Sequence, residues 1–200
     1  MGKIFCMMGK SVSGKDTIYK EIMRRGELPL RPVVPYTTRP IRDGEEQGVS
    51  YFFTDDAEAD RLLQENRIIE LRSYSTVYGI WRYFTADDGQ IDLDRASYLL
   101  IGTLESYLSF RSYFGSKQVV PVYVEVEDGE RLLRAIAREK TQTLPKYEEM
   151  CRRFLTDAAD FSEEKLKAAG IEKRFENREL EETIGEITDY IRSRLRPEED

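Results

Sequence analysis

The segment from Ile4 to Thr17 constrains this chain more than any other part of it. An apolar run, Ile4-Phe5-Cys6-Met7-Met8, is typical of a buried strand, and it leads directly into Gly9-Lys10-Ser11-Val12-Ser13-Gly14-Lys15-Asp16-Thr17. The order is therefore strand, Gly-x-x-x-x-Gly-Lys loop and a helix that can begin at Lys15. In that order the loop N–H groups and the positive end of the helix surround an anion, and the lysine adds a charge. We expect residues 9–17 to bind nucleotide phosphates rather than to form a plain strand-to-helix turn.

One position departs from the usual pattern. The residue after the lysine is Asp16, where a Ser or Thr hydroxyl normally holds Mg²⁺, and Thr17 comes one position later. Two arrangements stay open: Asp16 binds Mg²⁺ itself, or Thr17 does so through water.

Length and charge limit the class of protein. A chain of 200 residues fits one domain with a sizeable core. The net charge of −7 argues against general nucleic-acid binding, so a local cluster of Arg and Lys must hold any anionic substrate. No apolar stretch has the length of a membrane span, and the two cysteines, Cys6 and Cys151, lie far apart. We expect a cytoplasmic protein that binds neither membrane nor nucleic acid.

The chain has no histidine. This excludes His-based triads, His-ligated zinc and His general acid–base chemistry. Phosphoryl transfer remains open, because it depends on positioning and on charge neutralisation by Lys, Arg and Mg²⁺.

The hydrophobic pattern alternates between strands and helices, which predicts an α/β fold. We expect strands at 3–8, Val49–Phe53, Ile68–Leu71, Thr76–Tyr78, Tyr98–Gly102, Val119–Val126 and Lys173–Asn177. We expect helices at about Lys15–Arg25, Asp56–Asn66 (capped by Asp55), Leu104–Tyr113, Asp128–Arg138 (capped by Asp128), Lys146–Ala169 and Leu180–Leu195.

A second informative stretch runs from Tyr36 to Tyr51. Arg39 and Arg42 lie three residues apart beside a threonine pair and a proline, and Tyr51 can add a hydroxyl donor. Arginine forks suit the oxygens of a phosphate monoester, so the stretch is a candidate anion clamp. Taken alone, it could equally be a solvated loop with two surface arginines.

With these two segments together, the chain resembles the guanylate kinase family, which transfers phosphate from ATP to GMP. The resemblance runs from Lys3 to about Ile191, and its most specific part is Thr37-Thr38-Arg39-Pro40-x-Arg42-x-Gly44-Glu45-x-x-Gly48-x-x-Tyr51-x-Phe53. It implies the P-loop kinase fold, with a parallel sheet core flanked by helices, an inserted small α+β substrate-binding subdomain and a helical lid. The implied boundaries are core 1–32, 83–138 and 170–196, nucleoside-monophosphate-binding subdomain 33–82 and lid 139–153.

The resemblance also implies site residues. Those expected to bind GMP are Arg39, Arg42, Tyr51 and Tyr78 at the phosphate, Glu70 at the guanine edge, and Gly79 and Thr103 nearby. Those expected to bind ATP are Gly9, Lys10, Ser11, Val12, Ser13, Gly14, Lys15, Asp16, Thr17 and Asn177. Taken singly, Tyr51 and Tyr78 could be packing aromatics, and Glu70 could face solvent.

The prediction of a lid rests on the positions of several arginines. Arg134 and Arg138 lie one helical turn apart, and Arg153 lies on the far side of a polar segment, with Arg152 as the alternative if the register differs by one. The resemblance implies that these arginines close over the triphosphate and, with Lys15, are catalytic. The alternative is a solvated helix face whose arginines pair with acids such as Glu130.

Three residues depart from the family pattern: Pro35 replaces a serine of the clamp, Ile80 a hydroxyl residue that contacts the guanine oxygen, and Thr103 an acid. Guanine specificity is therefore less firmly predicted than kinase activity. The leading hypothesis is an Mg²⁺-dependent kinase that uses ATP and GMP or dGMP, as a monomer or homodimer. One alternative acceptor is ribose 1,5-bisphosphate, because the kinases of that sugar phosphate have a similar Gly-Lys-Asp. Another alternative is a catalytically silent module that binds phosphorylated peptides.

Overall fold

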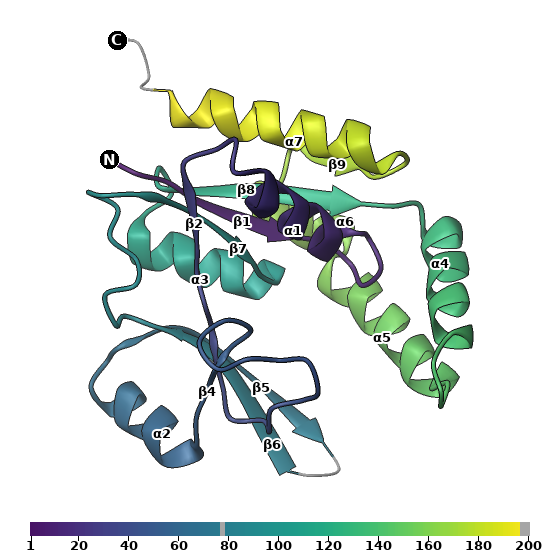
Figure 1. Ribbon diagram of the computed structural model, residues 1–200, viewed down its shortest axis with the longest axis horizontal. Coiled ribbons are helices and arrows are strands. Elements are labelled where there is room, and N and C mark those ends of the chain that lie inside the picture. The colour runs from purple at the N-terminus through teal and green to yellow at the C-terminus, as the bar shows by residue number, and fades with distance from the viewer. Residues whose placement is uncertain (77–78, 197–200) are drawn as a thin grey trace.

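The computed structural model describes residues 1–76 and 79–196. Its elements are, in chain order, β1 (Ile4–Met8), α1 (Lys15–Arg25), β2 (Leu30–Pro32), β3 (Tyr36–Thr37), β4 (Phe52–Phe53), α2 (Asp56–Gln64), β5 (Ile68–Thr76), β6 (Gly79–Ala86), β7 (Ser97–Ile101), α3 (Leu104–Phe114), β8 (Val119–Glu125), α4 (Asp128–Lys140), α5 (Tyr147–Asp160), α6 (Glu163–Ala168), β9 (Arg174–Glu176) and α7 (Leu180–Leu195) (Figure 1). Tyr78, which the resemblance placed at the acceptor phosphate, lies outside the described residues.

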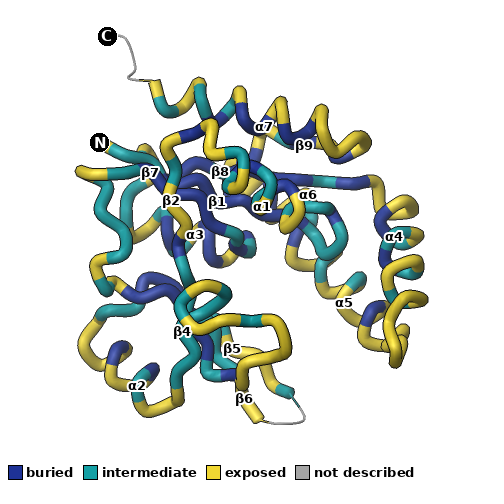
Figure 2. Tube along the Cα trace, viewed as in Figure 1, coloured by how far each residue is buried: buried dark blue, intermediate teal, exposed yellow. Residues whose placement is uncertain are grey.

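The central sheet has the strand order β2-β7-β1-β8-β9, and the neighbouring strands run parallel. Both faces of β1 are covered, so every one of its residues is buried (Figure 2). Parallel strands covered on both faces read as continuous apolar runs, which is the pattern that identified this strand. The predicted α/β class with a parallel sheet core is confirmed.

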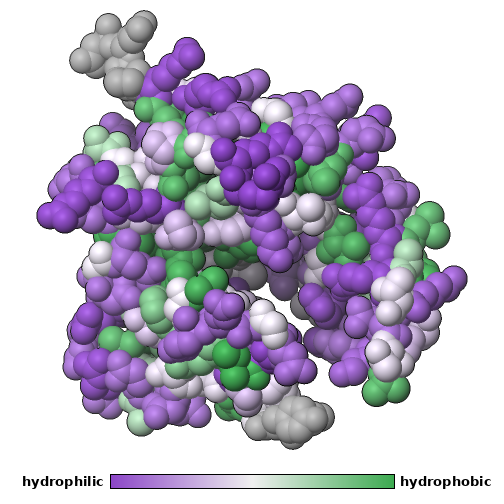
Figure 3. Space-filling model, viewed as in Figure 1, coloured by the Kyte–Doolittle hydropathy of each residue, from purple (hydrophilic) through white to green (hydrophobic). Residues whose placement is uncertain are grey.

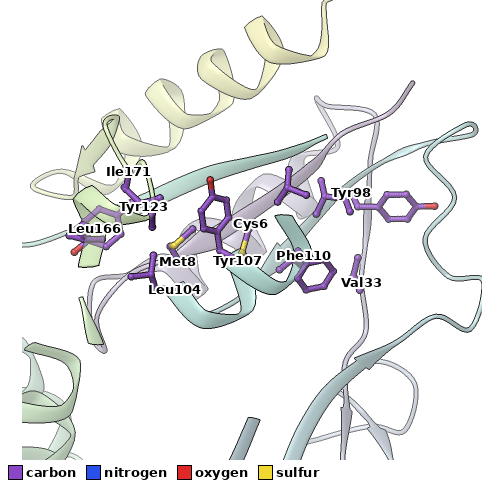
Figure 4. Packing of buried hydrophobic residues seen from close by; sticks show 14 of the residues in the cluster. Cys6, Met8, Val33, Tyr98, Leu104, Tyr107, Phe110, Tyr123, Leu166 and Ile171 are labelled. Carbon is purple, nitrogen blue, oxygen red and sulfur yellow. The ribbon is translucent and has the colours of Figure 1, made fainter. Parts of the chain in front are cut away.

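Side chains of β1 alternate between two core layers. Cys6 and Met8 face α3, where they pack near Tyr107 and Phe110 (Figure 4). The intervening Phe5 and Met7 face the opposite layer, which α1 and α7 form through side chains including Ile18, Ile22, Ile184, Ile187 and Ile191. This packing fixes the end of β1, and with it the start of the Gly9–Gly14 segment, against the rest of the sheet.

A smaller sheet has the order β4-β3-β6-β5 and forms, with α2, what we call the second lobe, residues 36–86. Ala59 and Leu62 of α2 pack against Phe84 and Ala86 of β6, which closes one face of this sheet. The other face is not covered by α2 and carries polar and aromatic side chains. In Figure 1 the second lobe lies below the central sheet, with α4 and α5 across from it.

Several local predictions need correction. The expected strand Val49–Phe53 is reduced to the two residues of β4, because residues 46–50 form a turn closed by Val49 and Ser50 N–H bonds to Glu46. The strand expected at Ile68–Leu71 is longer and runs to Thr76 as β5, whereas the strand expected at Thr76–Tyr78 lies, apart from Thr76, outside the described residues. Strand β6 was not expected, and the predicted subdomain boundary at residue 82 falls inside it.

Two helix predictions also need correction. The long helix expected over Lys146–Ala169 is divided into α5 and α6 at Phe161, because Ser162 caps a new helix by accepting the Lys165 N–H. The cap of α4 is Glu127, one residue before the expected Asp128, and its carboxylate accepts the Glu130 N–H. Within residues 1–76 and 79–196, no helix has the length and apolar character needed to cross a bilayer.

We predict that Thr103 stabilises the fold through its hydroxyl. Thr103 caps α3 in a capping box, since its Oγ1 accepts the Ser106 N–H at 3.1 Å and the Ser106 hydroxyl accepts the Thr103 N–H at 3.1 Å. Thr103→Ala should lower the free energy of unfolding by about 1 kcal/mol in urea denaturation, whereas Thr103→Ser should preserve it. Equal stability of all three proteins would contradict the capping role.

Candidate functional site

The Gly9–Gly14 segment, called the glycine loop below, joins β1 to α1 as predicted. Gly14 lies at the N-terminus of α1 with φ 87°, a left-handed conformation that favours glycine. A Cβ at Gly9 would lie 2.2 Å from the Val124 carbonyl oxygen of β8, so only glycine fits there. The loop therefore keeps backbone N–H groups and the start of a helix at the carboxyl edge of the sheet, where an anion is favoured.

Val12 adopts a left-handed backbone with φ 66°. For a β-branched residue this conformation is strained, by roughly 1–3 kcal/mol. The strain lies in the part of the loop that is expected to surround phosphate.

Asn177 supports the glycine loop from beneath. Its side-chain amide donates to the Ser13 carbonyl at 2.8 Å, and its own N–H donates to the Glu125 carbonyl. Its carbonyl accepts from Arg134 Nη2 at 3.3 Å. The structure thus brings Asn177 and Arg134 together beside the loop; a contact of Asn177 with adenine stays a prediction.

Lys15 and Asp16 form an ion pair at the first turn of α1, with 3.2 Å between Lys15 Nζ and Asp16 Oδ2. The Asp16 side chain is 66% exposed, and that of the neighbouring Thr17 is also exposed. Mg²⁺ in nucleotide sites is commonly held by one or two carboxylates together with substrate phosphates. A single accessible carboxylate beside the glycine loop fits that donor set, and no cluster of three or more potential ligands occurs among the residues that the structure describes.

A network missed by sequence reasoning joins the loop to α4 and α5. Arg131 is 1% exposed, stacks on the Phe154 ring at 4.0 Å and donates from Nη1 to Asp157 at 3.2 Å. The same Asp157 oxygen accepts the Ser11 N–H at 2.8 Å. A signal existed in the sequence, because Arg131 lies four residues before the buried Ala135 and so shares its inward helix face.

The predicted lid arginines lie around this network. Arg153 donates from Nη2 to the Ser11 hydroxyl at 3.3 Å, and Arg134 pairs with Glu130 at 2.9 Å. Arg138 is exposed, while Arg152 pairs with Glu149 on its own helix. Arg134 and Arg153 therefore lie at the glycine loop in this structure.

The second lobe contains the predicted clamp. Arg39 is 3% exposed and forms a two-bond fork with Glu45, at 2.7 Å from Nη1 and 2.6 Å from Nη2. Its guanidinium also lies 4.9 Å from the centre of the Tyr51 ring. The hydrogen bonds from Arg39 hold the Glu45 pKa far below its ordinary value, at about 2. Glu45 belongs to the motif between Thr37 and Phe53, but no role for it could be inferred from the sequence.

The remaining predicted acceptor residues differ in their surroundings. Arg42 is exposed and lies 5.8 Å from the Trp81 ring centre, and Gly79 begins β6 with φ 110°. Glu70 is buried rather than solvent-facing: Arg72 donates to its two oxygens at 2.9 and 3.3 Å, and the Thr85 hydroxyl donates to one of them at 3.1 Å. The Thr103 hydroxyl caps α3.

The two groups of residues lie on opposite sides of a hollow. The glycine loop with Arg134 and Arg153 belongs to the central sheet and to α4 and α5, whereas Arg39, Tyr51 and Glu70 belong to the second lobe. The space-filling view shows the surface hollowed between the second lobe and α5 (Figure 3). A phosphate donor and a phosphate acceptor could enter this hollow from the two sides.

Comparison with known proteins is consistent with this geometry. Residues 1–83 match the family model described as guanylate kinase. The chain is 30% identical over 166 residues to a guanylate kinase of Chlorobaculum tepidum, an alignment that covers 80% of this chain and 82% of that protein.

A second relative aligns over a shorter segment, and a solved structure has a similar fold. The chain is 45% identical over 74 residues to a guanylate kinase of Thermobifida fusca, covering 36% of this chain and only 37% of that protein. The crystal structure of guanylate kinase from Anaplasma phagocytophilum superposes with a TM-score of 0.68 at 21% identity, covering 98% of this chain and 88% of that one.

We predict that the Arg39–Glu45 pair makes stability depend on pH in the acid range. The Glu45 pKa is lowered on folding, so its contribution is complete above about 4.5 and is lost as the pH falls toward about 2. The difference in free energy of unfolding between the wild type and Glu45→Gln should therefore shrink over that range in urea titrations. A difference that stays constant with pH would contradict the assignment.

We also predict that glycine is more stable than valine at position 12. Val12→Gly removes the steric strain of the left-handed backbone, and the greater freedom of glycine in the unfolded chain offsets only part of the gain. The free energy of unfolding should rise by about 0.5–1 kcal/mol in thermal or urea denaturation. Val12→Ala, which keeps a Cβ, should recover much less, and a destabilised Val12→Gly protein would contradict the strain argument.

Proposed function

The chain belongs to the guanylate kinase family, and from that premise we propose that it transfers the terminal phosphoryl group of ATP to GMP or dGMP. The observation that carries the proposal is the pairing of two anion sites across one hollow: the glycine loop with Lys15, and the buried Arg39 fork. Because each site suits a phosphate, the arrangement favours transfer from one phosphate to another.

The donor phosphates would bind at the glycine loop. Backbone N–H groups at the start of α1 and the Lys15 ammonium group favour the β- and γ-phosphate oxygens. Asp16 is the residue best placed to hold Mg²⁺ together with those oxygens, with Thr17 beside it, and the ion would supply charge neutralisation there.

The acceptor phosphate would bind at the clamp. Glu45 supports this assignment, because its two oxygens accept from Arg39 in the fork geometry that phosphate oxygens also adopt. Arg42, which is exposed beside the Trp81 ring, would turn toward the same anion, and the Tyr51 hydroxyl can donate to it. Arg39 is oriented before the acceptor arrives, which lowers the entropy lost on binding.

Transfer needs no nucleophile from the protein. An oxygen of the acceptor phosphate attacks the γ-phosphorus, its bond to phosphorus forms as the bond to the ADP leaving oxygen breaks, and negative charge accumulates on the leaving group. Arg134 and Arg153 lie at the glycine loop and Arg138 lies further along α4, so movement of α4 and α5 would bring cations over that charge. In this proposal residues 139–153 are the mobile lid, and residues 33–82 are the subdomain that binds the acceptor. Closure would also exclude water and limit ATP hydrolysis.

One observation favours a second acceptor class. Both Glu70 oxygens accept hydrogen bonds from protein groups, and Ile80 has no hydroxyl to donate to the guanine oxygen, so the two contacts expected to read guanine are not made directly. An acceptor without a base, such as ribose 1,5-bisphosphate, would not need them. The silent phosphopeptide-binding module is disfavoured, because Gly9, Gly14 and Lys15 are all present and arranged as a glycine loop.

We predict that Lys15→Met abolishes transfer but not acceptor binding. ADP release with ATP and Mg²⁺ should fall at least ~100-fold, because a charge that stabilises the transferring group is lost. GMP affinity, measured by calorimetry, should stay within a few-fold, since Lys15 belongs to the donor side. Lys20→Met, an exposed lysine on the same helix, is the matched control and should leave both values unchanged.

A substrate panel distinguishes the acceptors. The wild type should turn over rapidly with GMP or dGMP and slowly with AMP, CMP and UMP. Turnover with ribose 1,5-bisphosphate alone would move the acceptor to sugar phosphates, and inactivity of the folded protein on the whole panel would favour the binding module.

A further inference from the structure

The face of the second-lobe sheet that α2 leaves open carries a continuous row of side chains. In β5 the alternate residues share one face, and the antiparallel register places their partners on β6 beside them. The members of this row are Glu70, Arg72 and Tyr74 on β5 and Thr85, Tyr83 and Trp81 on β6. Tyr83 contacts Tyr51, whose ring lies against Arg39, so the row continues into the clamp.

Glu70 is enclosed within this row. Its side chain is only 2% exposed, and both of its oxygens accept hydrogen bonds from protein groups. With so little of the carboxylate exposed, a guanine edge could donate to it only by reaching past the Arg72 guanidinium, which already donates two hydrogen bonds. Glu70 is therefore shielded from a ligand by Arg72.

Arg72 is the accessible member of the pair, with a side chain 16% exposed. It bonds to Glu70 through Nε and Nη2, the side edge of the guanidinium. The end edge of the group, made by Nη1 and Nη2, is a second pair of parallel donors. Burial opposes the charge, but Glu70 and, to a smaller extent, the neighbouring Tyr74 hydroxyl outweigh it and raise the Arg72 pKa, so Arg72 is a fixed cation.

Arg72 also lies near the clamp. Arg72 is paired in register with Tyr83, whose ring centre lies 5.9 Å from that of Tyr51, and the Arg39 guanidinium lies 4.9 Å from the Tyr51 ring centre. Burial raises the pKa of Tyr51, and the charges of Arg39 and Arg72 oppose that rise. A nucleotide whose phosphate binds Arg39 would therefore have room for its base over this face of the sheet, where Arg72 is the central member of the row on β5.

We propose that Arg72 is the residue that reads the acceptor base, donating through its end edge to O6 and N7 of guanine, and that Glu70 acts as a positioning residue for Arg72. An arginine fork matches these two acceptors, whereas adenine presents an N6 amino donor in place of O6 and is rejected. The inference rests on the proposed function and differs from the sequence prediction, in which the Glu70 carboxylate itself reads the guanine edge.

Equilibrium binding with four nucleotides tests this assignment. GMP and IMP differ only in the N2 amino group, so the wild type should bind them within a few-fold of each other. 7-Deaza-GMP lacks one acceptor and should bind roughly tenfold more weakly, and AMP more weakly still. Arg72→Met should lower GMP and IMP affinity roughly 10- to 100-fold and remove the penalty for 7-deaza-GMP. Arg72→Lys should rescue little, because lysine has no fork.

Controls separate binding from folding. Arg82→Met removes an ion pair of the same sheet, to Asp60 on the α2 side, and should leave every affinity unchanged. Glu70→Gln should weaken GMP and IMP by the same factor, a result that a direct contact to N2 would not give. Thermal unfolding checks that each variant is folded.

Two results would overturn the inference. Weak binding of IMP with normal binding of 7-deaza-GMP would place the reader at N1 and N2 and return the role to Glu70, and a folded Arg72→Met protein with unchanged GMP affinity would also refute it. If the wild type binds and phosphorylates GMP in either case, the proposed function stands while the role of Arg72 fails. If the wild type binds none of the four nucleotides, both fail.

Discussion

The Arg39–Glu45 fork lies in the second lobe, and the proposed acceptor site depends on it. A guanidinium that is 3% exposed needs a partner, because an unpaired buried charge costs several kcal/mol. Glu45 supplies that partner, and the Tyr51 ring beneath the guanidinium limits its movement. The chain thereby maintains a phosphate-shaped cation in the absence of phosphate. An acceptor phosphate must share or replace the Glu45 carboxylate, so its affinity is a difference between two good ion pairs.

The same arrangement recurs at the glycine loop. Asp16 pairs with Lys15, and Asp157 accepts the Ser11 N–H that lies among the loop donors. The net charge of −7 is therefore compatible with anion binding, since acidic side chains pair with the cations at each candidate anion site. Because opposite charges a few ångströms apart interact strongly when partly buried, these pairs hold the cations in position. A strongly charged phosphate, partly neutralised by a divalent cation, would compete with these acidic side chains for the cations better than a small anion would.

The sequence predicted the donor half more completely than the acceptor half, for a physical reason. Residues 4–25 carry the strand, the glycine loop and the start of α1 in one continuous segment, so pattern and spacing suffice to recognise them although β1 pairs with the distant β7 and β8. For Arg131, the helical spacing to Ala135 indicates an inward face but not the partners that such a face would meet. Its burial depends on Phe154 and Asp157, the latter 26 residues along the chain, and a helical pattern does not show which partner another helix will bring.

Strand β6 was missed for a related reason. Its two faces carry Trp81, Tyr83 and Thr85 on one side and Arg82, Phe84 and Ala86 on the other, so aromatic and polar residues occur on both faces and the usual alternation is absent. Both faces are in fact occupied: α2 covers one, with Arg82 bonded to Asp60, and the other contributes to the proposed acceptor site. Binding-site residues thus obscured the pattern by which the strand would have been recognised.

The Glu70–Arg72 pair illustrates what an ion pair can do beyond stability. Residues two apart on a strand share a face, so the sequence alone places these side chains together. Their unequal exposure, 2% against 16%, follows only from the packing of β5 on β6 and α3. A carboxylate in that position is too enclosed to meet a ligand, but it can orient a guanidinium that does. Because an arginine has two donor edges, one edge can satisfy the buried acid while the other remains for the substrate. In the proposed site, one residue of the pair therefore supplies orientation and the other supplies contact.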